Sequence, residues 1–304
     1  METPVQEDCD RYLGGNLRAI VEGIARSERF SDFSLEVTQA SAKGDNYLGL
    51  ILRVRISGRR DGKDLDSMSV IVKREQENEE QRAVVMVFFS NEAFMYGEVL
   101  PAFQKLQKEV GVLEDEAFSG TARWFASDES DSTVRLVLED MSARGYRLGD
   151  RLEGLDPAHC RLVLRQLGRF HALSFAMSDQ RPLELQRLRS GIKETIFCID
   201  SEGAIAHFHK MINNVSSILP NKFAAESKYV KRFQEFSANY VERMIDLVNG
   251  EAAEPYAVIC HGDCWTNNYL FKYSEVRLIH GLPYDLQRSQ FVAKQLLCNN
   301  IVII

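Results

Sequence analysis

The 304-residue sequence predicts an α+β fold with two lobes, a small antiparallel-sheet lobe followed by a mainly helical lobe. In the first 140 residues, short apolar stretches of strand character are separated by turn residues, whereas later apolar residues recur at helical spacing. The chain is also long enough for one large or two modest cores. We place the N-terminal lobe at 1–141 and the C-terminal lobe at 142–304, and expect ligands to bind in a cleft where lobes meet.

The N-terminal lobe is predicted to contain a helix, a set of strands and a second helix. An apolar stripe at helical spacing covers 9–26, although Gly14 weakens its first turn. Three strands are expected, at 33–37, 48–56 and 67–73. A second helix is expected at 88–100, and Pro101 should end or kink it.

The C-terminal lobe follows a last apolar strand at 134–138. A helix is predicted at 157–177 because leucines and Phe170 recur along one side, and 183–250 also reads as mostly helical. Two short buried strands, 256–260 and 269–271, flank a compact polar loop. A strand–loop–strand unit is therefore predicted to follow the helical region.

Composition excludes several classes of function. Apolar residues make up 45% and charged residues 27% of the chain, which is ordinary for a globular protein. The net charge of −7 argues against nucleic acid or an anionic membrane as the main partner. No apolar run is long enough to cross a bilayer, and the acidic N-terminus lacks the features of a signal peptide. Six scattered cysteines indicate reduced, cytoplasmic usage rather than a disulfide framework.

The polar loop at 261–268, His-Gly-Asp-Cys-Trp-Thr-Asn-Asn, carries the strongest functional signal. Asp263 and Asn268 are five positions apart, as are the Asp and Asn of the kinase catalytic loop, where Asp accepts the proton of the substrate hydroxyl and Asn holds magnesium. An ordinary polar turn would explain Gly262 but not the other residues. A zinc site at Cys260, His261 and Cys264 is disfavoured because no second pair completes four ligands.

The chain resembles the insect ecdysteroid kinase-like family, also called CHK kinase-like, which belongs with aminoglycoside phosphotransferases and choline kinases. The resemblance rests on separated segments that occur in the family's order between residue 30 and about residue 280. They are Gly44–Tyr47, Val70–Lys73, Phe89-x-x-Glu92-x-x-x-Tyr96 with Leu100-Pro101, Leu138–Met141, Leu167-x-x-x-His171-Ala-Leu-Ser174 and the 261–268 loop. The resemblance implies a protein kinase-like fold, with ATP and Mg²⁺ as cofactors.

The resemblance assigns roles to residues of the N-terminal lobe. Lys73 would bind ATP phosphates and pair with Glu92, although an edge-strand lysine and a solvated glutamate are the plain alternatives. The turn at Gly44, Asp45 and Asn46 would cover the phosphates with its backbone N–H groups, or is simply a hairpin turn. The backbone of the segment from Glu139 to Met141 would link the lobes and bond to the adenine edge.

The metal-binding part of the pattern departs from the family. Asn268 would hold Mg²⁺ together with a later Asp, but His280 stands where that Asp is expected and Asp285 follows five residues later. Histidine is a poor replacement because Mg²⁺ prefers oxygen ligands. Relatives also carry further helices after this point, so we expect the C-terminal lobe to be truncated and to expose apolar surface.

The predicted function is an ATP-dependent phosphotransferase acting on a hydroxyl of a small molecule. The resemblance implies an ecdysteroid or another lipophilic or xenobiotic alcohol as acceptor, with Asp263 as the catalytic base. The alternative is a catalytically impaired, pseudokinase-like protein that binds a nucleotide or ligand, which the His280 substitution favours. A weaker alternative is a thiol hydrolase with Cys264 as nucleophile and His261 as base.

Overall fold

The computed structural model describes most of the chain and separates it into two compact units. Description covers residues 6–40, 49–75, 82–129, 134–150, 152–194, 197, 202–224, 227–248, 250–273, 290–293 and 301–302. One unit comprises Met1–Leu173 with Asp263–Leu297, and the other Ser174–Gly262 with Cys298–Ile304. The predicted division after residue 141 follows the change in element type and stays a prediction.

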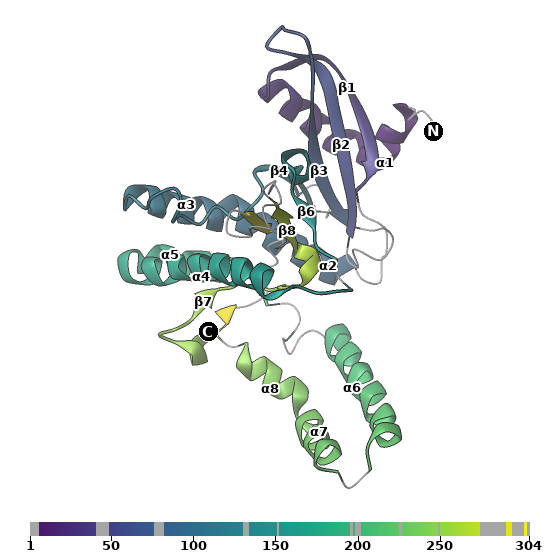
Figure 1. The fold of residues 1–304 in the computed structure, drawn as a ribbon, viewed down its shortest axis with the longest axis vertical. Coiled ribbons are helices and arrows are strands. Elements are labelled where there is room, and N and C mark those ends of the chain that lie inside the picture. The colour runs from purple at the N-terminus through teal and green to yellow at the C-terminus, as the bar shows by residue number, and fades with distance from the viewer. Residues whose placement is uncertain are drawn as a thin grey trace, which may run out of the picture. The chain divides into compact units, whose positions relative to one another are not determined.

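A five-stranded antiparallel sheet forms the centre of the first unit, in the order β1-β2-β3-β5-β4. Its strands are β1 (Phe30–Gln39), β2 (Gly49–Arg60), β3 (Leu65–Glu75), β4 (Trp124–Asp128) and β5 (Arg135–Glu139). The long β1–β2–β3 meander lies beside helix α1 (Gln6–Ser27) in Figure 1. The structure confirms the predicted α+β fold with an N-terminal antiparallel sheet and mainly helices afterwards.

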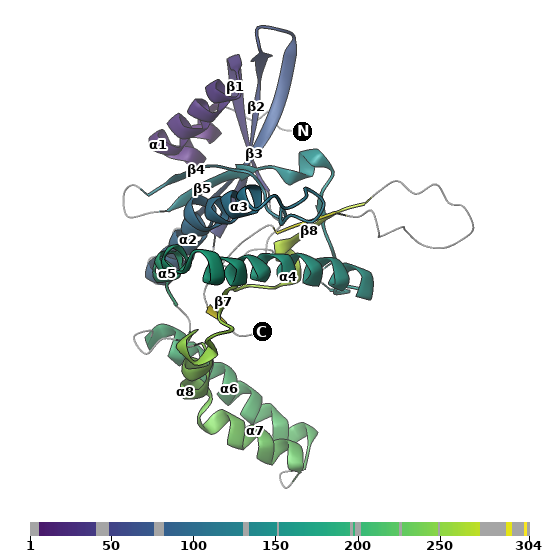
Figure 2. The ribbon, with the colours of Figure 1, turned by 90° about the vertical axis from the view of Figure 1, so that its left-hand side faces the viewer.

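Helix α1 covers one face of this sheet (Figure 2). Its apolar residues repeat at helical spacing, and Leu17 and Val21 are fully buried against Leu52, Val54 and other β-strand residues. Gly14 interrupts the helix with φ 64° and ψ 176°, as its weak helix propensity led us to expect. This core occupies one face of the sheet and leaves the other face for different contacts.

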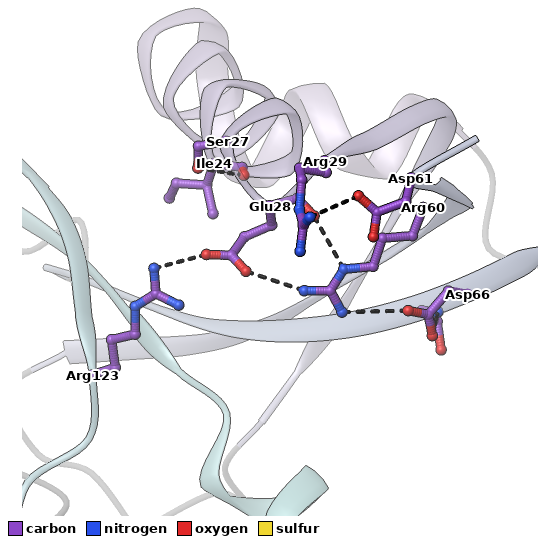
Figure 3. A network of polar contacts seen from close by, with 9 residues as sticks. Ile24, Ser27, Glu28, Arg29, Arg60, Asp61, Asp66 and Arg123 are labelled. Carbon is purple, nitrogen blue, oxygen red and sulfur yellow. Dashed lines mark hydrogen bonds and ion pairs between the residues drawn. The ribbon is translucent and has the colours of Figure 1, made fainter. Parts of the chain in front are cut away.

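A polar network fixes the end of α1 to the strands (Figure 3). Glu28, directly after the helix, accepts from Arg60 of β2 at 3.2 Å and from Arg123 at 2.7 Å. Arg60 also donates to the backbone oxygen of Glu28 at 3.1 Å. The network therefore ties three segments that are distant in the sequence.

Three helical segments without a break connect β3 to β4: α2 (Arg82–Phe94), the π-helix η1 (Met95–Val99) and α3 (Leu100–Glu109). Of the two outcomes expected at Pro101, an end or a kink, the end is excluded, because α3 continues for two turns beyond it. Pro101 lies in the first turn of α3, where its missing N–H is tolerated. The π-helix η1, which is a widened helical turn, lies directly before α3.

The remaining elements of the first unit are the 3-10 helix η2 (Met141–Arg144), a second sheet and most of α4 (Pro157–Gln180). The second sheet has the order β6-β8-β9, with strands β6 (Arg147–Leu148), β8 (Tyr269–Lys272) and β9 (Gln290–Ala293). The 3-10 helix η4 (Thr266–Asn268) directly precedes β8. This small sheet therefore holds the strand that follows the polar loop.

The second unit is mainly helical. It contains the end of α4 and α5 (Pro182–Ser190), α6 (Glu202–Lys222), α7 (Lys228–Ala238), α8 (Tyr240–Leu247), the 3-10 helix η3 (Gly250–Ala253) and strands β7 (Val258–Ile259) and β10 (Ile301–Val302). The α6 and α7 helices run side by side in both views of the ribbon (Figures 1 and 2). Ser174, the last residue of the predicted motif on α4, accepts from the backbone N–H of Ile259 at 3.0 Å. That bond holds the strand that leads into the polar loop.

Candidate functional site

The face of the main sheet opposite α1 carries the first part of the candidate site. Side chains alternate between the faces of a strand, so the burial of Val70 and Val72 against α1 turns Ile71 and Lys73 to the other side. The register pairs Lys73 with Ile51 and Ile71 with Arg53 across β2 and β3. These residues therefore form one continuous surface.

Lys73 is held by a buried ion pair with Glu92 of α2. The Lys73 ammonium contacts both carboxylate oxygens of Glu92, at 2.6 Å for Oε1. Lys73 is 4% exposed and Glu92 is 1% exposed. A charge buried this deeply requires a partner, so each residue fixes the position of the other.

A cavity of about 260 Å³ lies directly against Lys73. Its apolar walls come from three places, the sheet face just described, the segment after β5 and strand β8. They are Ile51, Ile71, Leu138, Met141, Tyr146 and Leu270. A largely apolar cavity that a lysine ammonium also lines suits a ligand that combines an aromatic base with anionic groups.

The segment from Glu139 to Ser142 closes one side of this cavity and is tied down by side chains. Asp140 is 4% exposed and caps η2, accepting from the backbone N–H of Ser142 at 3.0 Å and from its hydroxyl at 2.6 Å. Arg53 donates to Asp140 at 2.6 Å and to the Ser142 hydroxyl at 3.1 Å. The segment is thus fastened to β2 by a charge-assisted bond.

The polar loop forms the second part of the site. Asn268 ends the short helix η4, and its amide nitrogen donates to the Asp263 carboxylate at 2.7 Å and to the Asp263 backbone oxygen at 3.1 Å. Asn268 is buried, whereas Asp263 is half-buried. The predicted pair is therefore in direct contact, with the carboxylate of Asp263 accessible to solvent.

Tyr269, the first residue of β8, directly follows the loop and fixes its end in the protein interior. Its side chain is 1% exposed. Burial raises the pKa of Tyr269, and the neighbouring Cys264 and Asp263 raise it further. The phenol stays neutral near pH 7 and adds no charge beside Asp263.

The structure brings most of the predicted site residues into two groups. Lys73, Glu139 and Met141 line one cavity, and Glu92 is bonded to Lys73. Asp263 and Asn268 form the other group, which is joined to the cavity through β8 because Leu270 lines that cavity. The predicted phosphate-covering residues Gly44, Asp45 and Asn46 lie outside the described residues, as do His280 and Asp285.

Sequence reasoning did not single out Arg53, and it placed Asp140 in the linker between the lobes without a role for its side chain. Arg53 lies on the more polar face of β2, which also carries Arg55 and Ser57, so its charge does not stand out in the sequence. Asp140 precedes Ser142 by two positions, which is the spacing of an Asx cap. Only the Asp140–Ser142 spacing is visible in the sequence, because the partnership of Arg53 with Asp140 depends on the register of β2 and on the fold of η2.

The donors near the loop are of the kind that Mg²⁺ prefers. Asn268 and Asp263 supply oxygen ligands, and the amide nitrogen of Asn268 bonds to Asp263, which leaves its amide oxygen for another partner. Within the described part of the chain, no group of three or more His, Cys, Asp or Glu residues could hold a metal ion. A complete metal site would therefore need a ligand such as Asp285.

These features define the class of protein: a kinase-like fold in which a buried lysine–glutamate pair borders a cavity and an Asp–Asn loop follows later in the chain. The sequence model of the ecdysteroid kinase-like family matches residues 43–292, which is well over half of the chain. The chain belongs to that family, as the sequence resemblance predicted. No curated protein and no solved structure matches it. Among the helices that the structure describes, none has the length and apolar character to cross a membrane.

Proposed function

We propose that this chain is an ATP-dependent phosphotransferase that transfers the γ-phosphate to a hydroxyl of a small organic molecule. One observation carries the proposal: a buried lysine, fixed by a buried glutamate, lies at the end of an apolar cavity closed by a fastened segment. Family membership supports the same reaction class. The net charge and the family favour a small-molecule partner over nucleic acid, and the free cysteines Cys160, Cys260 and Cys264 suit a reducing, cytoplasmic location.

In this proposal the cavity binds the adenine end of ATP. Apolar side chains that line the cavity would contact the faces of the base, and the backbone from Glu139 to Met141 would bond to its edge. Lys73 would donate to phosphate oxygens while Glu92 keeps its ammonium in place. The chain's contribution is mainly positioning, because phosphoryl transfer needs little covalent help from the protein.

The loop would act on the acceptor. Asp263 would accept a hydrogen bond from the acceptor hydroxyl and take its proton as the hydroxyl attacks. Asn268 would keep the Asp263 carboxylate oriented through its amide nitrogen and, with Asp285, would bind Mg²⁺. The ion, when bound, neutralises negative charge on the phosphates.

A lipophilic alcohol, such as an ecdysteroid or a xenobiotic alcohol, is the acceptor class that family membership favours. The second unit contains an aromatic cluster in which Phe197 stacks on Phe208 at 4.8 Å and Tyr240 lies 6.0 Å from Phe208. Such a cluster suits an apolar ring system but also suits core packing. The acceptor therefore has to be identified by assay.

The test is Mg²⁺-dependent ATP consumption over a panel of steroid and xenobiotic alcohols. We expect turnover with at least one alcohol, and Asp263→Asn should lower that turnover by about 10²–10⁴-fold while nucleotide binding persists. Cys264→Ser is the matched control in the same loop and should keep full activity; its inactivity would favour the thiol hydrolase instead. Turnover by Asp263→Asn at the level of the unaltered chain would refute the assigned base.

The sequence supports one other function, a nucleotide-binding protein without turnover, because His280 replaces the expected metal-binding Asp. The same assay separates the two. Nucleotide binding that is indifferent to Mg²⁺, with no turnover for any alcohol, would favour the pseudokinase. Binding that tightens with Mg²⁺ together with turnover would favour the phosphotransferase.

A further inference from the structure

Arg53 connects two walls of the Lys73 cavity. It belongs to β2, whereas its partners Asp140 and Ser142 belong to the segment that follows β5, and all three line the cavity. The side chain of Arg53 is 37% exposed and that of Asp140 is 4% exposed. The phosphotransferase proposed above binds its nucleotide through Lys73 and the linker backbone, and neither contact includes Arg53.

The carboxylate of Asp140 joins β2 to the 3-10 helix η2. One of its oxygens accepts from Nε of Arg53 at 2.6 Å. The other accepts from the backbone N–H of Ser142 at 3.0 Å and from its hydroxyl at 2.6 Å. Arg53 also donates through Nη2 to the hydroxyl oxygen of Ser142 at 3.1 Å. A planar guanidinium that bonds two partners fixes their orientation as well as their distance, which a flexible ammonium does less well.

The backbone alone holds residues 140–142 less firmly to the sheet. The N–H of Asp140 donates to the carbonyl oxygen of Ser69 on β3 at 3.4 Å, which is long for a hydrogen bond. Ala143 donates to the oxygen of Asp140 at 3.2 Å, but that bond lies within the turn itself. The bond from Arg53 is shorter and charge-assisted, so it is the stronger link between this segment and the sheet.

Met141 is the residue whose position this link controls. It is 3% exposed and lines the cavity. As the first residue of η2, it has a backbone N–H without a partner inside the helix, and this N–H donates to no other group in the described part of the chain. Arg53 bonds the residues on both sides of Met141, Asp140 and Ser142. The direction of the N–H of Met141 therefore depends on the guanidinium.

A fixed backbone N–H can distinguish adenine from guanine. Adenine has an acceptor at N1 and a donor at its amino group, whereas guanine has a donor at N1 and an acceptor at O6. An N–H that cannot move meets an acceptor in the first base and a donor in the second. Sites built to hydrogen-bond one ligand discriminate strongly against an analogue that leaves their polar groups unpaired. A loosened segment would lose this discrimination, because it could turn to suit either base.

We propose that Arg53 is a positioning residue for nucleotide binding. By holding Asp140 and Ser142 it fixes the N–H of Met141, and it thereby makes the cavity selective for adenine over guanine. The inference rests on the proposed function, since it requires the cavity to bind the base of the nucleotide. Arg53 acts through its two partners, so the planar shape of its guanidinium matters in addition to its charge.

The test is isothermal titration calorimetry of the full chain with ATP and with GTP in the presence of Mg²⁺, which needs no acceptor alcohol. The unaltered chain should bind ATP at least about tenfold more tightly than GTP. Arg53→Met keeps an apolar stem but no donors, and should weaken ATP about tenfold and GTP less than about threefold. Arg53→Lys keeps the charge without the planar fork and should recover only part of the preference. Arg55→Met is the matched control, at an exposed arginine two positions along the same strand, and should change neither affinity.

A second substitution tests whether Arg53 acts through its partner. Asp140→Asn keeps an oxygen that can accept from Ser142 but removes the charge that Arg53 contacts, so it should narrow the preference as much as Arg53→Met does. The double variant Arg53→Met/Asp140→Asn should be no worse than either single variant, because the two residues act as one unit. Circular dichroism checks that each variant is folded. If Arg53→Met does not fold, Arg53→Lys and Asp140→Asn supply the same comparison.

The possible results separate this inference from the proposed function. ATP affinity that is unchanged in Arg53→Met would overturn the inference, as would the absence of a preference for ATP in the unaltered chain. Equal losses for ATP and GTP would also overturn it, because they indicate a loosened fold rather than a displaced N–H. A loss in Arg53→Met without one in Asp140→Asn would mean that Arg53 contacts the nucleotide directly. If the unaltered chain binds neither nucleotide, the proposed function itself is refuted, and the inference with it.

Discussion

The candidate site contains two pairs of contacting residues, and the two pairs differ in their surroundings. Lys73 and Glu92 are both charged and both almost completely buried. Asp263 and Asn268 also contact each other, but Asp263 is half-buried and only one of the two residues carries a charge. The first pair is therefore part of the core, and the second is a contact within a surface loop.

The difference separates structural from chemical roles. Breaking a buried ion pair leaves a charge without solvent or partner, so the fold itself should suffer. A half-exposed carboxylate can be solvated when its partner is removed, so the fold should tolerate the change. Each prediction below tests whether the burial of a residue, rather than its number of contacts, determines how much stability is lost when the residue is replaced.

The largest effect is expected at Lys73. Lys73→Met should lower the free energy of unfolding by about 3–5 kcal/mol, because the buried Glu92 carboxylate would lose the ammonium that neutralises its charge. Urea denaturation followed by circular dichroism measures this. The double variant Lys73→Met/Glu92→Leu should recover most of the loss, since it removes both charges, yet it should still fail to bind nucleotide. If the double variant is as unstable as the single one, the ion-pair argument fails.

A substitution of Asn268 should affect the Mg²⁺ dependence of turnover more than the stability of the fold. Asn268→Ala should lower the free energy of unfolding by only about 1–2 kcal/mol, because both hydrogen bonds of its amide nitrogen go to the half-buried Asp263, which solvent can reach. It should raise the Mg²⁺ concentration needed for half-maximal ATP turnover about tenfold, because a metal ligand is lost. Titrating Mg²⁺ in the turnover assay measures this. Neighbouring Asn267→Ala is the control; an equal shift in Asn267→Ala would show that the loop, not the ligand, was disturbed.

The contrast also explains what the sequence could predict. The three long strands were predicted because alternation is a local signal. The pairing of Lys73 with Glu92 followed from the family resemblance, which uses a lysine at the end of one strand and a glutamate on the next helix. Strand β4 had no predicted counterpart because Trp124–Asp128 lacks clean alternation, and four of its five residues are half-buried. Its place in the sheet is decided by pairing with β5.

Features set by tertiary contacts were beyond the sequence pattern. The π-helix around Tyr96 involves close packing between Gly97 and Trp124, which no local propensity encodes. The bond from Arg53 to Asp140 joins residues 87 positions apart. The Asp263–Asn268 contact, by comparison, spans five residues; the loop motif predicted a joint role for the two residues but not the hydrogen bond between them.

Glu28 should show an intermediate effect. Its carboxylate bonds two arginines, but those arginines are 34% and 59% exposed in their side chains. Glu28→Gln should therefore lower the free energy of unfolding by about 1–2 kcal/mol, well below the loss at Lys73. Asp66→Asn removes the charge from an exposed contact to Arg60 at 3.3 Å and keeps an oxygen that can accept from the backbone N–H of Ser67, so it should change the free energy of unfolding by less than about 0.5 kcal/mol. A loss at Glu28 as large as that at Lys73 would mean that contact number, not burial, dominates.

The smallest effect is expected at His171 on α4, which is half-buried. Burial lowers the pKa of His171 from its ordinary value of 6.5, so the folded chain binds a proton less readily than the unfolded chain. The free energy of unfolding should therefore fall as the pH drops below about 6.5, and level off once the folded state is protonated too. The slope should stay well below 1.4 kcal/mol per pH unit, because solvent reaches the ring. Urea denaturation of the unaltered chain and of His171→Gln at pH 7.5 and 5.5 measures it, with exposed His209→Gln as the control. If the free energy of unfolding of His171→Gln depends on pH as strongly as that of the unaltered chain, the pH dependence comes from other groups. The partial burial of His171 would then have no measurable effect on stability.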